Sequence, residues 1–345
     1  MADRGLTGAG APAGRDTPAE GPPQPPPALL MPGQGSQYQG MGTGLYRDVS
    51  AFAAIIDEVF ELMGRAGEQL RSDWLAASPQ LPVDHASRSQ PLLFAIDYAL
   101  GRLLLDRGLR PAVLLGHSVG EMAAATLAGI FDLPGATRIV GQRVGQFTLV
   151  PPGGMAAVAA SRAEVEPYLR PGVDVGAVNT PRQTVIAGAD EPLRTTVDAL
   201  RQAGYTCAAV PSTVPFHSEW LRPAVDPACS LLASLPANPP RIPVVSGYTA
   251  GYLTEAEVKD PRYWAEHPVN PVLFWPALAR LAEAGPHLLV ECGPGTSLTT
   301  FARRHPDVRS GRCEVLSLIG PAASGPAREA EHLAAAAARL GVSLP

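Results

Sequence analysis

The stretch Pro111-Ala-Val-Leu-Leu-Gly-His-Ser-Val-Gly-Glu-Met-Ala-Ala-Ala125 decides the fold of this chain. The apolar run Val113-Leu-Leu115 predicts a short strand, Gly116-His-Ser-Val-Gly120 breaks it, and the small residues from Glu121 to Leu127 predict a helix. Glycines on both sides of Ser118 allow a turn so tight that the serine hydroxyl stands exposed at the end of the strand. The helix that follows points its N-terminal N–H groups at the same place and favours negative charge there. An ordinary glycine-rich turn between a strand and a helix is the alternative interpretation.

The composition restricts the classes of function. The chain has 345 residues, of which 46% are hydrophobic, enough for a real core in one large domain or two. Its net charge of −5 gives no reason to expect a nucleic acid or an anionic membrane as a partner. No apolar run approaches the roughly 20 residues that span a bilayer, and the N-terminus lacks the apolar core of a signal peptide. We therefore expect a soluble, cytoplasmic protein.

The cysteines support the same expectation. They show neither the spacing of metal ligands nor that of a disulfide framework: Cys207, Cys229, Cys292 and Cys313. Free or buried thiols in a reducing compartment are the plain expectation. We expect no metal site and no bound cofactor.

The pattern of elements divides the chain into a tail, a large domain and a small inserted domain. Residues 1–27 are rich in Gly, Ala and Pro and predict a disordered or extended tail, either a simple tether or a docking arm. Residues 28–152 and 212–345 contain alternating strands and helices and predict one α/β catalytic domain. Residues 153–211 predict the order β-α-β-β-α-β, which is that of the ferredoxin-like unit.

A second glycine-rich loop follows the first expected strand. The apolar run Ala28–Met31 predicts that strand, and Pro32-Gly-Gln-Gly-Ser-Gln37 comes next. A loop in this place brings backbone N–H groups to the C-terminal edge of a sheet, where open α/β folds bind their ligands. A phosphate loop is the competing interpretation, but its spacing is absent. Further along, Gln90-Pro91 is expected to open an amphipathic helix that closes near Gly108.

Two single residues outside these loops are candidates for chemistry. Arg143 lies on an expected helix among apolar neighbours, where an arginine is most often solvated. If it points into a cleft instead, its guanidinium fork suits a substrate carboxylate. His217 follows the inserted domain, and a place at a domain junction favours it as a base. Six other histidines compete for that role: His85, His117, His267, His287, His305 and His332.

Seven motifs occur in one order along the chain: Gly33-Gln-Gly-Ser-Gln37, Gln90-Pro91, Gly116-His-Ser-Val-Gly-Glu121, Arg143, Asn179-Thr-Pro-Arg-Gln183, Pro215-Phe-His-Ser218 and Glu291-Cys-Gly-Pro-Gly295. Together they resemble the malonyl-CoA:acyl carrier protein transacylase family, which includes the acyltransferase domains of polyketide synthases. The resemblance covers roughly residues 28 to 320. It implies an α/β-hydrolase-like large domain with a ferredoxin-like insert, which agrees with the pattern of elements.

The resemblance also implies roles for single residues. Ser118 would be the nucleophile, and His217 would be the base that accepts its proton. Backbone carbonyls near His267 would orient the imidazole, because a base needs a fixed tautomer. The backbone N–H groups of Gln34 and Val119 would form the oxyanion hole.

The implied reaction moves an acyl group from CoA through Ser118 to the phosphopantetheine thiol of an acyl carrier protein. Arg143 would select malonyl-type groups by binding their carboxylate. The other implied substrate-binding positions are Gln90, His117, Asn179 and Phe216. Acyl-CoA and a carrier protein are thus the expected partners, in polyketide or fatty acid biosynthesis.

Some positions depart from the family pattern. Phe147 and Thr148 stand where Met and Gln are frequent, and Leu221 replaces another frequent Met. Phe216 resembles the malonyl-selecting pattern, whereas Val214-Pro215 matches the free-standing enzymes better. Because these positions lie near the acyl pocket in the family, the identity of the acyl group stays open.

Four hypotheses follow. The first is a discrete malonyl transferase that serves a synthase in trans, and the second is a transacylase that moves a larger acyl group between two carrier proteins. The third is a serine hydrolase that clears stalled acyl groups, and the fourth is an inactive docking module. Arg303 and Arg304 are weak candidates for contacting an acidic carrier protein, since exposed arginine pairs are normally solvated. The sequence leaves the pathway, the carrier protein, the oligomeric state and the role of the tail open.

Overall fold

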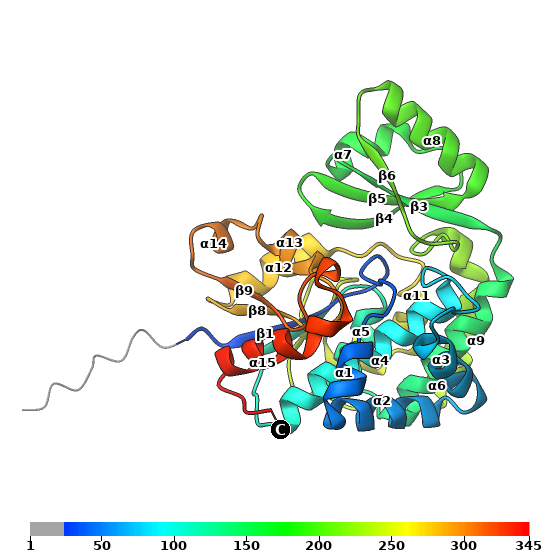
Figure 1. Ribbon diagram of the computed structural model, residues 1–345. Coiled ribbons are helices and arrows are strands. Elements are labelled where there is room, and N and C mark those ends of the chain that lie inside the picture. Colours follow the sequence, from blue (N-terminus) through cyan, green and yellow to red (C-terminus); the bar gives the residue numbers. More distant parts are fainter. Residues whose placement is uncertain (1–23, 345) are drawn as a thin grey trace, which may run out of the picture.

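A parallel sheet forms the centre of the larger domain in the computed structural model, which describes residues 24–344 (Figure 1). The order of its five strands is β7-β2-β1-β8-β9, and each neighbouring pair is parallel. The strands are β1 (Pro27–Met31), β2 (Val113–Gly116), β7 (Val244–Val245), β8 (Leu288–Glu291) and β9 (Glu314–Ser317). Every residue of β2 and β8 is buried, as expected for apolar strands that are covered on both faces.

Helices surround this sheet. They are α1 (Thr43–Asp48), α2 (Ser50–Leu62), α3 (Arg65–Leu75), α4 (Ala86–Asp106), α5 (Val119–Leu127), α6 (Leu133–Gln146), α9 (Val225–Ala233), α10 (Glu255–Lys259), α11 (Pro261–Glu266), α12 (Phe274–Glu283), α13 (Ser297–Ala302), α14 (Pro306–Arg309) and α15 (Glu329–Arg339). All nine residues of α5 are buried, so the helix that follows Ser118 lies inside the core. Among residues 24–344, no helix is long and apolar enough to cross a membrane.

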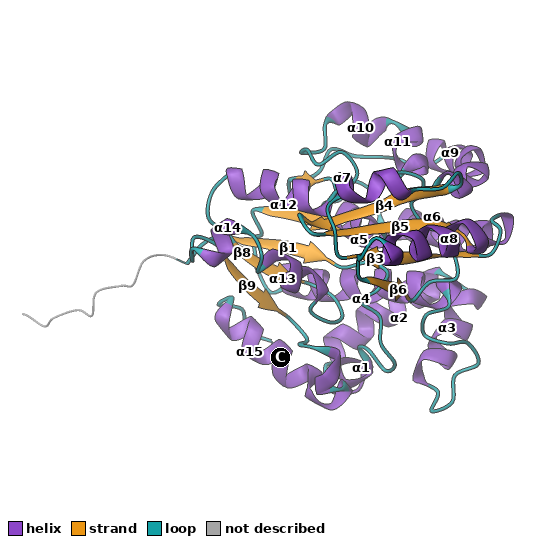
Figure 2. Ribbon diagram, turned by 90° about the horizontal axis from the view of Figure 1, so that it is seen from above, coloured by secondary structure: helices purple, strands orange, loops and turns teal. Residues whose placement is uncertain are grey.

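The smaller unit is a four-stranded antiparallel sheet with the order β4-β5-β3-β6. Its elements follow one another as β3 (Gly153–Val158), α7 (Arg162–Val165), β4 (Val173–Thr180), β5 (Gln183–Ala189), α8 (Asp190–Gln202) and β6 (Cys207–Val210). Figure 1 shows α7 and α8 on the outer side of this sheet, and Figure 2 looks down on it over the larger domain. Val158, Ile186 and Leu200 belong to its own small core. The opposite face of the sheet therefore meets the larger domain.

The structure corrects the end of the expected tail. Most of it, residues 1–23, lies outside the described residues. Pro27, however, belongs to β1: its carbonyl accepts a hydrogen bond from the Ala112 N–H at 2.8 Å, and the Pro26 carbonyl accepts one from Leu288 at 3.1 Å. A proline lacks only the donor, so it can open a strand by accepting. The first residue of β1 is therefore held by a hydrogen bond to its carbonyl, which an apolar sequence pattern does not reveal.

The structure also corrects the start of the helix expected at Gln90-Pro91. The helix α4 begins at Ala86, and Pro91 lies inside it. A proline so near the N-terminus removes a single helical hydrogen bond, so the burial of almost the whole helix outweighs that loss. The proline therefore marks the second turn of the helix rather than its first residue.

Candidate active site

Ser118 occupies a strained turn between β2 and α5. Its backbone has φ 55° and ψ −122°, a conformation that residues other than glycine rarely adopt. A Cβ on Gly116 would lie 2.2 Å from the Glu121 Cα, and one on Gly120 would lie 2.2 Å from the Met31 carbonyl oxygen. Positions 116 and 120 must therefore both be glycine, which explains why glycines stand on both sides of Ser118 in the sequence.

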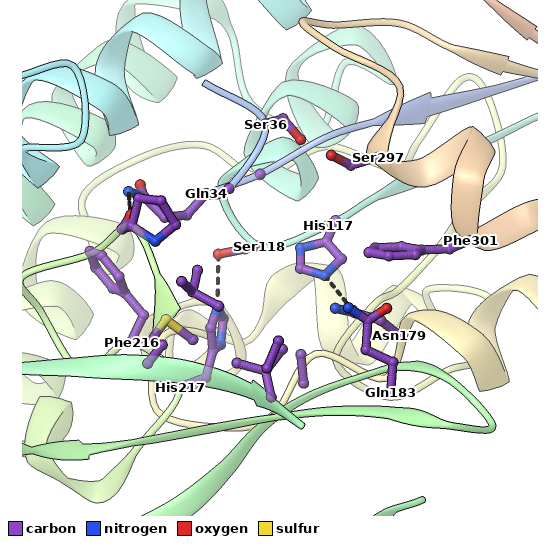
Figure 3. A pocket seen from close by; sticks show the side chains of 18 of the residues that line it. Gln34, Ser36, His117, Ser118, Asn179, Gln183, Phe216, His217, Ser297 and Phe301 are labelled. Carbon is purple, nitrogen blue, oxygen red and sulfur yellow. Dashed lines mark hydrogen bonds between the residues drawn. The ribbon is translucent and has the colours of Figure 1, made fainter. Parts of the chain in front are cut away.

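The hydroxyl of Ser118 contacts the ring of His217. Figure 3 shows this pair beside the cavity, and the distance from Ser118 Oγ to His217 Nε2 is 2.7 Å. On the other side of the ring, Nδ1 lies 2.7 Å from the backbone oxygen of Asn270. A carbonyl can only accept, so Nδ1 carries the proton and Nε2 is free to accept one from Ser118. The geometry is that of a nucleophile with its general base.

Burial keeps this base neutral. It lowers the pKa of His217 to about 3, and the nearby His267 ring adds to the effect. His217 as a whole is 3% exposed. An imidazole in this place is unprotonated at neutral pH and ready to take the serine proton.

The orienting carbonyl lies three residues beyond the predicted position. We expected it near His267, and the backbone of His267 does interact weakly with the His217 ring, but Asn270 supplies the 2.7 Å acceptor. After α11 the chain turns back, because the N–H groups of Val269 and Asn270 both bond to the Glu266 carbonyl. The turn itself is local, but its contact with the ring of His217 is tertiary, so the sequence did not indicate which carbonyl reaches the ring.

The side chain of His267 has a different partner. Its Nε2 lies 3.0 Å from Oε2 of Glu121, a buried carboxylate on α5. The same carboxylate accepts hydrogen bonds from Ser246 Oγ at 2.8 Å and from the Gly247 N–H at 2.9 Å. Glu121 thus ties the helix of the nucleophile to the segment that carries the orienting carbonyl.

The two predicted oxyanion donors lie beside Ser118. Val119 is the first residue of α5, and Gln34 follows Gly33, whose Cβ would come within 3.0 Å of the Ser118 Cβ. Within residues 24–344, neither the Gln34 nor the Val119 N–H donates to a protein acceptor. Both donors are free to bind an oxygen at the serine.

The side chain of Gln34 fixes its loop from two sides. Its Nε2 donates to the Pro211 carbonyl at 2.9 Å, across the junction of the two domains. Its Oε1 accepts from Ser89 Oγ at 2.9 Å and from Gln90 Nε2 at 3.0 Å. Gln90 therefore holds the loop and also lines the inner cavity described next.

Two cavities meet at the serine and histidine. An outer cavity of about 200 Å³ lies between the domains, and an inner cavity of about 30 Å³ lies behind the pair. Ser118, Phe216 and His217 line both. A thioester that passes through the outer cavity can present its carbonyl to Ser118 and its acyl group to the inner one.

The outer cavity holds two of the predicted substrate-binding residues. His117 Nε2 and Asn179 Oδ1 are 2.9 Å apart, and Figure 3 shows this bond to one side of Ser118. Burial lowers the pKa of His117, so its ring is neutral and donates from Nε2 to the amide oxygen.

Two further residues of the outer cavity, Gln183 and Phe301, were not predicted as site residues. Gln183 closes one of the seven motifs, and that position was the available signal, although no role was attached to it. Phe301 lies on α13, outside every motif, so the sequence contained no signal for it.

The inner cavity contains the guanidinium of Arg143. It donates to the Trp264 carbonyl at 3.1 Å, and among the described residues it forms no ion pair. Burial lowers the pKa of Arg143 to about 10, so it stays charged at neutral pH, and Glu121 supports that charge from a distance. Of the two interpretations of this arginine, the structure favours the one that points it into the cleft.

The residue types at the site define its chemistry. Within residues 24–344, no group of three or more His, Cys, Asp or Glu side chains could hold a metal ion. The site offers nucleophilic attack by a serine, with a neutral base, two backbone donors and a partly buried cation.

Comparisons with known proteins identify the family of this chain. The acyl transferase domain family matches residues 29–342. The chain is 36% identical over 279 residues to a phenolphthiocerol/phthiocerol polyketide synthase of Mycobacterium tuberculosis and 37% identical over 279 residues to the polyketide synthase GfsB of Streptomyces halstedii. These alignments cover 81% and 79% of this chain, but only 19% and 5% of the two synthases. The chain thus spans about a fifth or less of these relatives.

Solved structures show the same fold. The acyltransferase domain from the second module of the salinomycin polyketide synthase superposes with a TM-score of 0.82 at 34% identity, covering 93% of this chain and 75% of that one. FabD from Acinetobacter baumannii superposes with a TM-score of 0.79 at 26% identity, covering 92% and 100%. The fold and the site define an acyltransferase. The chain belongs to the acyl transferase domain family, which confirms the resemblance seen in its motifs.

Proposed function

We propose that this enzyme transfers a malonyl-type acyl group from CoA to the phosphopantetheine thiol of an acyl carrier protein, in polyketide or fatty acid biosynthesis. The observation that carries the proposal is the unpaired guanidinium of Arg143 in the small cavity behind Ser118. A partly buried cation that forms no ion pair favours an anionic ligand, and a carboxylate on the acyl group supplies one. Simple acyl groups leave that charge uncompensated.

The first half of the reaction loads the enzyme. Ser118 Oγ attacks the thioester carbonyl carbon while His217 Nε2 takes the hydroxyl proton. The N–H groups of Gln34 and Val119 bind the oxyanion that forms. The carbon–sulfur bond then breaks, and the CoA thiolate takes the proton from His217, leaving an acyl ester on Ser118.

The second half reverses these steps with another thiol. The phosphopantetheine thiol gives its proton to His217 and attacks the ester carbonyl. Ser118 then leaves and recovers the proton. No cofactor is required, since acyl-CoA and the carrier protein are both substrates. The cleft between the two domains is mostly apolar around the serine, which helps the thiol to compete with water.

We describe the architecture as an α/β-hydrolase-like domain with a ferredoxin-like insert, and the antiparallel β-α-β-β-α-β unit supports that description. Arg303 and Arg304 directly follow α13, are exposed and join no ion pair within residues 24–344, although Arg304 Nη1 donates to Thr180 Oγ1 at 3.5 Å. They are available to an acidic carrier protein near the outer cavity.

A cytoplasmic location is part of the proposal, and the four unpaired cysteines support it.

A panel of donors tests the function. The enzyme is mixed with a type II holo-acyl carrier protein and with malonyl-, methylmalonyl- or acetyl-CoA. The intact mass of the carrier protein is then measured by mass spectrometry. We expect malonylated carrier protein from malonyl-CoA, and none with a Ser118→Ala variant. Loading only from acylated carrier proteins would favour a transacylase between carriers. Release of free acid faster than transfer would favour an editing hydrolase.

A further inference from the structure

The side chain of Gln146 has no assigned role, although it lines the inner cavity with Arg143. We infer that Gln146 is a second substrate-binding residue, whose amide N–H donates to the carboxylate of the acyl group beside the Arg143 guanidinium. The inference rests on the proposed function and extends it, because it adds a donor that the family resemblance does not supply.

The amide nitrogen of Gln146 is buried and unpartnered. The residue is 7% exposed, and within residues 24–344 no protein group accepts a hydrogen bond from its Nε2. Buried polar atoms are almost always hydrogen-bonded, so an orphaned donor in a native structure needs an explanation. A ligand that binds in the cavity provides one.

Gln146 and Arg143 lie on α6, and both donors line the inner cavity. Arg143 and Gln146 are spaced at i and i+3, which puts them on the same face of the helix. No acidic side chain among the described residues lines this cavity. A carboxylate has two oxygens with about four acceptor sites, so it can satisfy a guanidinium fork and an amide together.

Another glutamine on the same helix provides a matched comparison. Gln142 Nε2 donates to the Pro227 carbonyl at 2.9 Å, so its amide is satisfied by the protein. It does not line either cavity. Replacing Gln142 removes a glutamine from α6 without touching the acyl group.

The test compares Gln146→Leu, Gln146→Glu and Gln142→Leu with the wild type. Leucine keeps the approximate volume of glutamine and removes the donor, whereas glutamate keeps the shape and replaces the donor by a negative charge. The measurement is the rate of Ser118 acylation by malonyl-CoA and by acetyl-CoA, followed by intact-protein mass. We expect Gln146→Leu to lower the malonyl:acetyl rate ratio about 10-fold, since a hydrogen bond to a charged group is lost.

Gln146→Glu should lower the ratio further, because its carboxylate repels that of malonyl, and Gln142→Leu should leave it within about twofold. A role in packing alone predicts equal losses with both donors, and that result, or an unchanged ratio, would overturn the inference. If either Gln146→Leu or Gln146→Glu fails to fold, the rate ratio of the other variant still tests the inference. The wild-type arm separates the two proposals: malonyl loading with an unchanged variant ratio rejects only the role of Gln146, whereas a wild type that loads no malonyl rejects both.

Discussion

The ring of Phe147 packs edge-on against the ring of Phe216, with the ring centres 5.1 Å apart and the planes at 81°. Both side chains line the inner cavity next to Ser118. This aromatic pair therefore forms one wall of the cavity. Three small residues, Ala224, Ala228 and Ala265, also line this cavity.

Removing the ring of Phe147 should therefore enlarge the acyl pocket. We expect Phe147→Ala to raise loading from methylmalonyl- or ethylmalonyl-CoA relative to malonyl-CoA by about 10-fold, as one or two methylene groups gain room. Competition assays with paired donors measure this ratio. Phe301→Ala is the control, because Phe301 lines only the outer cavity. An equal shift in both variants would contradict the assignment.

Loss of the Arg143 charge should abolish selection for the carboxylate. We expect Arg143→Ala to lower kcat/KM for malonyl-CoA by about 100-fold, the effect of a strong charge-assisted contact, while acetyl loading is unchanged or rises. Arg138→Ala is the matched variant, since Arg138 lies on α6 but is exposed. A parallel loss with malonyl- and acetyl-CoA would show that Arg143 acts on folding or on the dyad instead.

The acid limb of the pH profile should lie far below the usual range for histidine. His217 must be neutral to accept the serine proton, and burial lowers its pKa to about 3. We expect kcat/KM for acylation to vary less than about threefold between pH 5 and 8. Stopped-flow acylation at several pH values measures this. A half-maximal rate near the ordinary pKa of about 6.5 would contradict the account.

The same shift makes stability depend on pH. The folded pKa of His217, about 3, lies below the unfolded value of about 6.5, so the unfolded chain binds more protons between these limits. The contribution to stability is complete above about pH 6.5 and is lost as the pH falls towards 3. Thermal unfolding should show that His217→Gln, which cannot titrate, loses less stability than the wild type from about pH 7 to pH 5.

The loop that carries Gln34 should tolerate no side chain at Gly33. A Cβ there would lie 2.3 Å from the His117 carbonyl oxygen, so Gly33→Ala must move the loop and with it the Gln34 N–H. We expect kcat to fall by about 10²- to 10³-fold, as for the loss of an oxyanion donor. The control is Gly141→Ala on α6, where a Cβ meets nothing within 4 Å. That variant should keep its activity and gain about 0.5–1 kcal/mol in stability.

The sequence predicted those parts of the fold that depend on local patterns. The strand, turn and helix around Ser118 follow from apolar runs and from glycines that sterics require. The prediction that α4 starts at Gln90-Pro91 is wrong, because a proline that often opens a helix is also tolerated in the second turn when the helix is buried.

The parts that the sequence did not predict depend on tertiary packing. Asn270 and Phe301 carry no local signal, since each acquires its place only when distant segments meet. The separation of the substrate-binding residues into an outer and an inner cavity also depends on tertiary packing, so the sequence did not predict it. The side chains of His117 and Asn179 come together from two domains, whereas Arg143 lies behind the serine.

The central claim is that Ser118 carries a malonyl-type acyl group during transfer. The most direct measurement is the intact mass of the enzyme after brief incubation with malonyl-CoA, followed by peptide mapping of the modified residue. The account predicts the added mass of one malonyl group on Ser118, its absence in Ser118→Ala, and its removal by a holo-acyl carrier protein. An unmodified enzyme with malonyl-CoA and its α-substituted analogues, or a stable label on a residue other than Ser118, would contradict it.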